Sequence, residues 1–381
     1  MKNLKEIDIA RKLIRCRSIA PKDDGALGIV EKECKSMGFK CTKLKFSEKG
    51  YPSINNLYAQ IGNGKPHFSF AGHVDVVPAN KKEWSVDPFK GQIKKKFLIG
   101  RGAVDMKSAV ACFLSAARSF LDKDKNFKGS ISLLITSDEE TFAVNGTKKI
   151  LKWLKKKRIR IDDCLVGEPT NLQTLGDQIK IGRRGGFNGI LTVYGKAGHS
   201  AWPNRTVNPV SGLMKMLTRI DKKHLDKGTK HFQPSIVSIT SIDVKNEALN
   251  VIPAQATGCF NIRFNTLHTI ASLTKWMKKE FNKVGLKYKL ETYISGNAFL
   301  TKPGKFSELV KKCVKKIIKK NPKYATDGGT SDARFIKDYA NVVEFGLVGK
   351  TMHTNNERVS LNDLKKLTQI YKLILEEYFN Y

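Results

Sequence analysis

Short apolar runs rich in β-branched residues alternate with amphipathic helical patterns over roughly the first half of the chain. In the clearest helical pattern, one apolar stripe recurs at helical spacing through Val110, Phe113, Leu114, Ala117 and Leu121. Alternation of this kind predicts an α/β fold, with a mainly parallel sheet flanked by helices on both faces. The expected strands are 56–61, 68–72, 131–136 and 164–166, and the expected helices are 3–16, 27–37, 106–121 and 147–157.

The pattern changes near Lys180, and the first pattern returns after residue 293. In between, the order indicates a compact α+β unit resembling a ferredoxin-like fold, with strands 187–193, 235–242, 256–264 and 287–292 and helices 207–220 and 270–284. A helix at 305–319, a strand at 342–345 and a closing helix after Ser360 follow; Ser360 and Asp363 fit a capping box. Because candidate ligands lie on both sides, we predict a discontinuous domain, 1–180 with 294–381, and an inserted domain, 181–293.

Composition favours a cytoplasmic protein. Apolar residues make up 40% of the 381, enough for a core in each of two domains. No stretch reaches the ~18 apolar residues that cross a membrane, and residues 1–20 lack the apolar centre of a secretory signal. The seven cysteines are scattered without a Cys-x-x-Cys pair, as in a reducing compartment. We expect no membrane partner.

The net charge of +34 raises the question of a nucleic-acid partner. The lysines, however, are spread along the whole chain, and in 306–320 they fill the helical face opposite an apolar stripe. The basic runs 94–96 and 155–158 also lack interleaved aromatic residues. A solvated surface therefore explains the charge, and we expect no nucleic-acid partner. Nucleic-acid binding is the competing reading, and the charge could also speed encounter with an acidic small substrate.

His73 and Asp75 stand directly after an expected strand, between Gly72 and Pro78. In an extended chain, residues two apart face the same way, so Asp75 can lie behind the imidazole and fix its tautomer. A lone histidine is more often a satisfied core residue. The His-x-Asp spacing at a strand end favours a metal ligand.

Asp105 stands directly before the expected helix 106–121 and after Gly102. As a carboxylate at a strand–loop–helix junction it is a candidate metal ligand. A helix N-cap is the alternative for this aspartate, and the two roles are compatible.

Asp138, Glu139 and Glu140 follow the expected strand 131–136. Neighbouring side chains outside a helix point different ways, so one carboxylate can bind a metal while the other takes a proton from water. A solvated acidic turn is the alternative for this cluster.

Glu168 follows the expected strand 164–166, and His353 comes late in the chain. Each is weak evidence alone. Together, the candidates supply two histidines and three or four carboxylates, with no cysteine. Nitrogen and oxygen donors suit a hydrolytic zinc site better than a structural one. The sequence therefore predicts a hydrolase with two divalent metals and a spare carboxylate for proton transfer.

These motifs, in this order, resemble the co-catalytic zinc aminoacylase/carboxypeptidase family. The likeness runs from about residue 4 to 378 and rests on His73-x-Asp75, Gly102-x-x-Asp105-Met106-Lys107, Asp138-Glu139-Glu140, Gly167-Glu168-Pro169-Thr170 and His353. It implies a zinc-exopeptidase-like catalytic domain with an inserted ferredoxin-like lid and dimerisation domain. It also implies two Zn²⁺ per subunit, or Co²⁺ or Mn²⁺ in their place, and a homodimer.

The resemblance also implies a role for each matching residue. Asp105 bridges the two metals, one of which is also held by His73 and Glu168 and the other by Glu140 and His353. Glu139 is the general base, and Asp75 supports His73 from behind. The peptide bond Asp105–Met106 is expected to be cis.

Within the family, the likeness is greatest to the members that remove a succinyl group from a diamino acid in lysine and diaminopimelate biosynthesis. It implies Arg183 as the residue that binds the succinyl carboxylate and His199 as a catalytic residue that reaches the partner subunit's site to stabilise the oxyanion. The remaining substrate contacts that it implies are Asn250, Arg263, Gly329 and Thr330. The alternatives are sibling amidases, namely an acetylornithine deacetylase or a metallo-dipeptidase. Two positions depart from the pattern: Gly186 replaces a common serine, and Gly349 replaces an asparagine found in some members.

Overall fold

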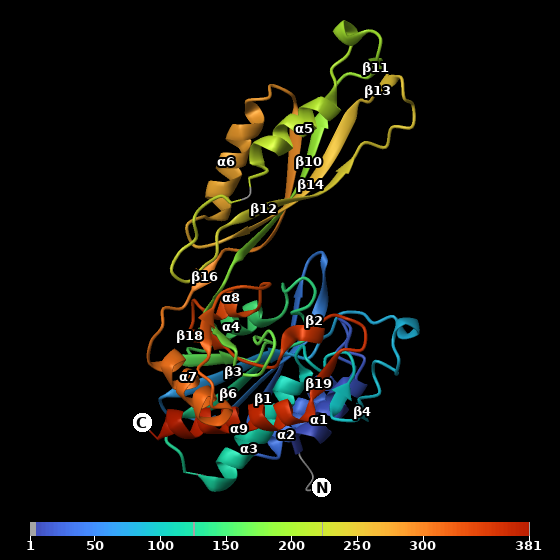
Figure 1. Cartoon of the computed structure of the whole chain (residues 1–381). Helices are drawn as coiled ribbons and strands as arrows, with labels where there is room; N and C mark the ends of the chain where they lie inside the picture. The colour runs from blue at the N-terminus through green and yellow to red at the C-terminus, as the bar shows by residue number, and fades with distance from the viewer. Residues whose placement is uncertain (1–4, 125, 223, 381) are drawn as a thin grey trace. The chain divides into compact units, whose positions relative to one another are not determined.

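The computed structural model describes residues 5–124, 126–222 and 224–380 (Figure 1). The chain forms two compact units. Unit 1 contains the described residues up to Ile181, together with Thr301–Ala325 and the chain from Ser331 onward. Unit 2 contains Gly182–Leu300 and the short segment Thr326–Thr330. Unit 1 is therefore assembled from three separate stretches of chain.

Unit 1 is built on an eight-stranded sheet in the order β1-β2-β6-β3-β7-β18-β8-β17. The four strands β6, β3, β7 and β18 run parallel, whereas β1, β2 and β6 pair antiparallel. β3 and β6 are buried along their whole length, as central parallel strands require. The strands are β1 (Lys40–Glu48), β2 (Tyr51–Gly62), β3 (His67–His73), β6 (Ser130–Thr136), β7 (Asp163–Val166), β8 (Gln178–Lys180), β17 (Lys323–Ala325) and β18 (Asn341–Glu344).

Helices cover both faces of this sheet (Figure 1). The layer on one face contains α1 (Lys5–Arg15), α2 (Ala26–Lys35), α3 (Lys107–Lys123) and α9 (Leu361–Phe379), and α7 (Lys305–Ile318) packs beside α9. The opposite face carries α4 (Thr147–Lys156) and the short α8 (Ala333–Ile336). A small sheet in the order β19-β5-β4 lies apart from the main one. Its strands are β19 (Arg358–Ser360), β5 (Phe97–Ile99) and β4 (Gln92–Lys94).

The core under the sheet is aromatic. Phe70 of β3 stacks on Phe113 of α3 with ring centroids 4.2 Å apart, and Tyr371 of α9 meets both rings edge-on. All three side chains are fully buried. The Tyr371 hydroxyl donates a hydrogen bond of 2.7 Å to the carbonyl of Phe345, so its polar end is satisfied inside the core.

Unit 2 is an antiparallel four-stranded sheet in the order β12-β14-β10-β15, with two helices packed on one face. Its strands are β10 (Gly185–Tyr194), β12 (Ile236–Asp243), β14 (Gln255–Phe264) and β15 (Tyr288–Gly296), and its helices are α5 (Pro209–Ile220) and α6 (Ile270–Asn282). Phe187, Phe260 and Phe281 are central to its core. α5 begins at Pro209 because the Asn208 side chain accepts hydrogen bonds from the next turn and proline tolerates the first helical position. Two short pairs, β11 (Gly198–His199) with β13 (Val251–Ile252) and β9 (Gly182–Arg183) with β16 (Phe299–Leu300), complete it.

Each expected strand and helix corresponds to an element of the structure, with bounds that differ by a few residues. Residues 3 and 4 of the first expected helix lie outside the described residues, and the described helix runs from Lys5 to Arg15. Ser360 caps α9 by accepting from the amide of Asp363, which is one half of the expected capping box. The pattern missed β1, β8, β17, the small sheet and the two-residue strands β9, β11, β13 and β16. β1 lies at a sheet edge, carries three exposed lysines and buries only Leu44, so it lacks an apolar run.

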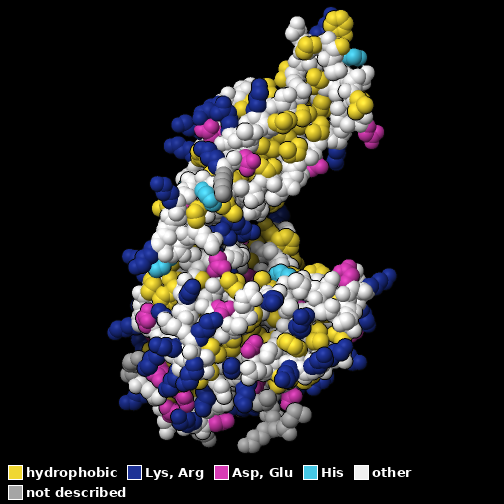
Figure 2. Space-filling view, in the orientation of Figure 1, with side chains coloured by type: hydrophobic (Ala, Val, Ile, Leu, Met, Phe, Trp, Pro, Cys, Tyr) yellow, Lys and Arg dark blue, Asp and Glu magenta, His cyan; other side chains and the backbone are white. Residues whose placement is uncertain are grey.

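None of the helices in the described part of the chain combines the length and apolarity that crossing a membrane requires. All seven cysteines are free thiols. Lys and Arg side chains are scattered over the visible face rather than gathered into one patch (Figure 2).

Replacing Tyr371 by phenylalanine tests the buried hydrogen bond to Phe345. Because the variant leaves a buried carbonyl without its donor, Tyr371→Phe is expected to lower the free energy of unfolding by about 1–3 kcal/mol. Calorimetric or denaturant-induced unfolding of the whole chain measures it. The matched control is Tyr324→Phe, because the Tyr324 hydroxyl donates to Glu308 at the exposed surface. Equal effects of the two substitutions would contradict the prediction.

Candidate metal centre

The carboxyl ends of neighbouring parallel strands bring the site residues together. His73 is the last residue of β3 and pairs with Thr136, the last residue of β6, so the segment after Thr136 starts beside the imidazole. On the other side of β3, Ala71 pairs with Val166 at the end of β7, two residues before Glu168. Parallel strands end at the same edge of the sheet, which is where open α/β sheets bind ligands.

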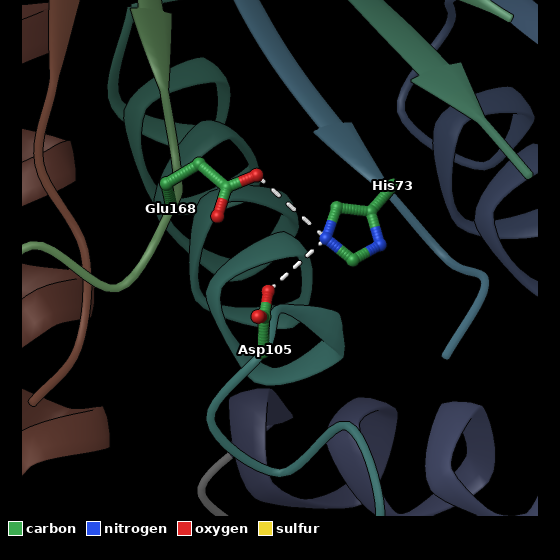
Figure 3. A group of neighbouring side chains, drawn as sticks. All are labelled: His73, Asp105 and Glu168. Carbon is green, nitrogen blue, oxygen red and sulfur yellow. Dashed lines mark hydrogen bonds and ion pairs between the residues drawn. The ribbon is translucent and has the colours of Figure 1, made fainter. Parts of the chain in front are cut away.

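The first ligand group consists of His73, Asp105 and Glu168 (Figure 3). The imidazole Nε2 of His73 lies 3.1 Å from Oδ1 of Asp105 and 3.7 Å from Oε1 of Glu168. All three residues are buried. The other ring nitrogen, Nδ1, lies 2.9 Å from the backbone carbonyl of Asp75, so it is held away from the two carboxylates. That contact leaves Nε2 facing the group.

The second ligand group consists of Asp105, Glu140 and His353. Nε2 of His353 lies 3.1 Å from Oδ2 of Asp105 and 3.0 Å from Oε1 of Glu140. Asp105 therefore faces His73 with one oxygen and His353 with the other. A single carboxylate is shared between the two groups, as the bridging role requires.

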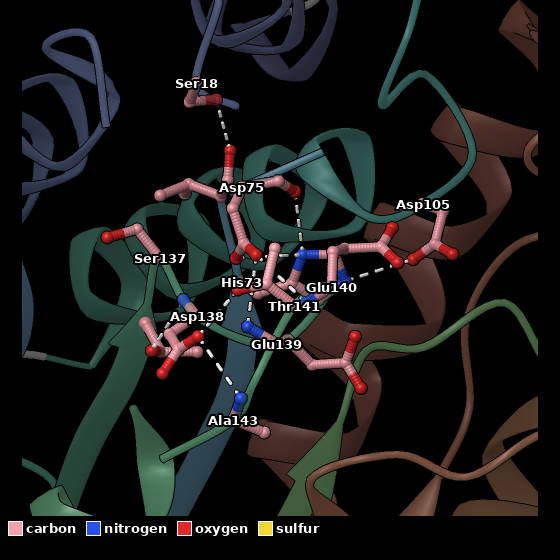
Figure 4. A network of polar contacts seen from close by, with 12 residues as sticks. Ser18, His73, Asp75, Asp105, Ser137, Asp138, Glu139, Glu140, Thr141 and Ala143 are labelled. Atoms are coloured by element: carbon pink, nitrogen blue, oxygen red, sulfur yellow. Dashed lines mark hydrogen bonds and ion pairs between the residues drawn. The ribbon is translucent and has the colours of Figure 1, made fainter. Parts of the chain in front are cut away.

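Asp75 connects the histidine to the two glutamates (Figure 4). Its Oδ1 lies 3.5 Å from Nδ1 of His73, and its Oδ2 accepts hydrogen bonds from the backbone amides of Glu139 and Glu140 at 3.1 and 2.9 Å. Asp75 is fully buried. It thus fixes the backbone that carries both glutamates as well as lying beside the imidazole.

Asp138 is a buried organiser of its loop. Its carboxylate accepts hydrogen bonds from the hydroxyl of Thr141 and from the amides of Ala143, Val144 and Asn145 (Figure 4). Only 2% of the residue is exposed, so the reading of this cluster as a solvated acidic turn is wrong for Asp138. The hydrogen bonds hold the turn in the shape that presents the following two glutamates.

Asp105 does not cap α3 with its side chain. The helix begins at Lys107, with Met106 in the N-cap position and no side-chain cap, and the Asp105 carboxylate engages the two histidines instead. The peptide bond Asp105–Met106 is cis, as the family resemblance implied. Gly102 permits the tight turn that precedes this cis peptide bond. Its φ is +82°, and a Cβ atom at this position would lie only 2.8 Å from the side chain of Val76.

The histidines and carboxylates of the two groups shift one another's pKa. Burial disfavours a charged imidazole, but hydrogen bonds to Asp105 and Asp75 outweigh it and raise the pKa of His73 well above its usual value. Hydrogen bonds to Asp105 and Glu140 raise the pKa of His353 to about 10. Burial opposes a charge on Asp105, yet its two histidine partners hold the pKa of that carboxyl below its usual value.

Burial acts in the opposite direction on the two glutamates. It raises the pKa of Glu139 well above its ordinary value; the charge of His73 opposes this rise, and nearby carboxylates, Asp332 first, add to it. Burial also raises the pKa of Glu140. The region therefore concentrates negative charge that protons on the two histidines help to offset, and divalent cations supply positive charge of the same kind.

The donor set fits a pair of divalent metal ions. Within each group, one donor atom from each residue lies within 4.8 Å of the others, and Asp105 belongs to both groups. The donors are imidazole nitrogens and carboxylate oxygens without a thiolate, the chemistry of hydrolytic zinc sites. His73 and Glu168 would hold one ion, Glu140 and His353 the other, and Asp105 both.

His199 and the expected substrate contacts belong to unit 2. His199 is exposed in β11, where its Nδ1 accepts from the amide of Ala201. Arg183 is buried in β9 and donates to the carbonyl of Gly329 at 3.1 Å, and Thr330 follows that glycine. Arg263 pairs with Gly186 across β14 and β10, and the carbonyl of Asn250 accepts from the amide of Ser200.

Two further residues support the site without a recognisable motif in the sequence, Glu357 and Arg101. Glu357 is completely buried and accepts hydrogen bonds from the loop that carries Asp105, and Arg101 pairs with it. The two are separated by 256 positions in the chain. No local pattern marks such a pair. The one available signal is a glutamate four residues after a candidate histidine, in a chain with only 35 acidic residues.

Comparison with known proteins identifies the family. The sequence pattern described as Peptidase family M20/M25/M40 matches residues 69–377. A succinyl-diaminopimelate desuccinylase of Parvibaculum lavamentivorans is 50% identical over 378 residues, 98% of this chain and 95% of its own. The protein of the same name from Pelagibacter ubique is 51% identical and covers 100% of both chains.

Solved structures share the fold. The M20 family metallo-carboxypeptidase Sso-CP2 from Sulfolobus solfataricus superimposes with a TM-score of 0.79 at 18% identity, covering 100% of both chains. The aminopeptidase PepT from Bacillus cereus gives a TM-score of 0.78 at 20% identity, covering 98% of both. The predicted α/β fold with a mainly parallel central sheet is confirmed. The chain belongs to the peptidase family M20/M25/M40.

Proposed function

We propose that this chain hydrolyses the amide of N-succinyl-LL-2,6-diaminopimelate to succinate and LL-2,6-diaminopimelate, in lysine and diaminopimelate biosynthesis. The observation that carries the proposal is the likeness, at about half identity over nearly the whole chain, to relatives named succinyl-diaminopimelate desuccinylase. The two ligand groups that share Asp105 supply the matching chemistry. Water cleaves the amide: its oxygen bonds to the carbonyl carbon, the C–N bond breaks, and a proton goes to the leaving nitrogen.

Two divalent ions, when bound, supply Lewis-acid character that polarises the scissile carbonyl and makes nearby water more acidic. We assign the proton transfers to Glu139, which accepts a proton from the attacking water and delivers one to the leaving amine. The position of Glu139 supports this assignment. Its backbone amide donates to Asp75, which also lies beside His73, and the neighbouring Glu140 belongs to a ligand group. Burial favours the proton-bearing form that the second transfer needs.

The substrate contacts are part of the same proposal. Arg183 would bind the succinyl carboxylate, for which a planar guanidinium is suited, and His199 of a partner subunit would stabilise the oxyanion. Asn250, Arg263, Gly329 and Thr330 would complete the contacts. We further propose a cytoplasmic homodimer whose inserted segment, 181–293, serves as lid and dimerisation domain, and zinc, cobalt or manganese as the metal. The support is the matching motifs and, for the compartment, the seven free thiols.

A sibling amidase, such as an acetylornithine deacetylase or a metallo-dipeptidase, is the competing function. The observation that favours a sibling amidase is Gly186, because serine is common at this position in similar members of the family. A side chain there would start 3.0 Å from both Nη1 of Arg263 and Oγ of Ser295. The hydroxyl of Ser295 therefore lies close to where the hydroxyl of a serine at position 186 would be. A hydroxyl in this region keeps the succinylated substrate as our preferred assignment although position 186 is glycine.

Substrate preference and metal dependence are tested together. The purified protein is expected to cleave N-succinyl-LL-diaminopimelate with a kcat/KM at least about 100-fold above that for N-acetylornithine, a difference of ~2.7 kcal/mol in transition-state binding. A chelator should abolish both activities, and added Zn²⁺ or Co²⁺ should restore them. A higher kcat/KM for the acetylated substrate would transfer the assignment to the sibling amidase.

Replacing each of the two neighbouring glutamates by glutamine, in separate variants, distinguishes proton transfer from metal binding. Glu139→Gln should lower kcat by ~10²–10⁴-fold with both metals still bound, because only the proton acceptor is lost. Glu140→Gln should instead reduce the bound metal towards one ion per chain. Metal content by atomic emission and initial rates on the same samples measure both effects. Retained activity in Glu139→Gln would exclude it as the base.

The scattered positive charge should influence encounter with the substrate, which carries three carboxylates and one ammonium. We expect kcat/KM to fall at least about twofold as ionic strength rises from ~0.02 to ~0.3 M, because salt screens long-range attraction. The rate at saturating substrate, kcat, serves as the internal control and should stay constant. A kcat/KM that is independent of salt would remove charge steering from the account.

A further inference from the structure

Glu357 is a buried glutamate whose two carboxylate oxygens accept hydrogen bonds from the loop of residues 101–105. None of the residue is exposed. Its Oε2 accepts hydrogen bonds from Nη1 of Arg101 at 2.9 Å and from the amide of Gly102 at 3.1 Å. Its Oε1 accepts from the amides of Val104 at 2.7 Å and Asp105 at 3.1 Å. A carboxylate with four donors is fully satisfied, as a buried charge must be.

The small sheet of unit 1 brings this acid to its loop. Arg358 of β19 pairs with Ile99 of β5, and the amide of Gly100 donates to the backbone carbonyl of Glu357 at 3.0 Å. The chain leaving β5 therefore turns around the Glu357 side chain before it reaches α3. Asp105 stands at the end of that turn, in the segment that the carboxylate holds.

Arg101 extends the contact to two more segments of the site. Its guanidinium donates to the carbonyl of Thr354 at 3.2 Å, next to His353, and to the carbonyl of Pro78 at 3.4 Å, in the loop that follows Asp75. It also lies over the ring of Trp84, 5.1 Å from the ring centroid. The pair thus contacts the backbone of Asp105, the residue after His353 and the loop that follows Asp75.

We propose that Glu357 is a positioning residue that holds Asp105 between the two metal-ligand groups, with Arg101 as its counter-ion. The inference rests on the proposed function, in which Asp105 bridges two ions. Glu357 acts through the backbone: it fixes the amide of Asp105, and it lies four residues after His353, whose imidazole faces Asp105. The Glu357 side chain therefore anchors Asp105, and its counter-ion Arg101 holds the carbonyl of Thr354 next to His353.

The proposal predicts which change should loosen the site. In Glu357→Gln, one oxygen becomes an NH₂ group that faces backbone N–H donors, and the charge that balances Arg101 is lost. Because Asp105 belongs to both groups, affinity for both ions should fall, not for one alone. Loss of supporting contacts of this kind typically lowers metal affinity or activity by ~10–100-fold.

The experiment titrates metal-free full-length protein with Co²⁺, following heat release and the visible spectrum of the bound ion. Glu357→Gln should show at least about tenfold weaker binding at both sites and a changed spectrum, and kcat should fall more than KM rises. Glu6→Gln is the matched control, because Glu6 is also a buried glutamate but accepts from Ser115, between α1 and α3. The control should bind Co²⁺ as the unaltered chain does.

A second variant keeps the test decisive if Glu357→Gln does not fold. Glu357→Asp retains the charge but is one methylene shorter, so it cannot span Arg101 and all three amides; it should fold and bind both ions at least about threefold more weakly. Affinities and spectra equal to those of the unaltered chain in the folded variant would overturn the proposal, as would a loss confined to one ion. If the unaltered chain itself bound no metal or cleaved no succinyl amide, the proposed function would fail instead.

Discussion

Repulsion between buried carboxylates is the constraint around which unit 1 is arranged. The two ligand groups place Asp105, Glu140 and Glu168 in a small, largely buried region, where like charges cannot all remain ionised without compensation. The fold supplies it locally. Asp75 takes two backbone amides, and Asp105 is faced by an imidazole on each side. The negative charge that these contacts leave uncompensated is the charge that divalent cations neutralise.

The arrangement of the fold was readable from the sequence wherever burial imposed a simple pattern. β3 and β6 are buried along their length, so apolar residues dominate their sequences between occasional serines, and the apolar stripe of α3 includes Phe113, which packs on β3. β1 was not predicted, because most of its residues are exposed or half-exposed at the sheet edge. β8 and β17 were missed for another reason: strands of three residues carry too few positions for any period to appear.

The candidate site divides in the same way. Residues whose chemistry is combined with a position at a strand end, such as His73 and Glu168, could be proposed from the sequence, and they do converge. Residues that act on a backbone segment far away in the chain could not. Glu357 holds a distant loop through hydrogen bonds from the amides of that loop, and amide donors are present at almost every position, so the sequence contains no partner to recognise.

The strand order has a consequence for how the protein is made. β18 is inserted in the main sheet between β7 and β8, although more than 150 residues, including all of unit 2, separate it from them in the chain. During synthesis, the first strands of this sheet therefore leave the ribosome well before β18, which later fills the position beside β7. Until β18 and the segment carrying His353 emerge, the edge of β7 is open to pairing with other chains. Synthesis of this protein thus includes a period of exposure to aggregation and to chaperones, whose length is set by the time needed to translate the insertion.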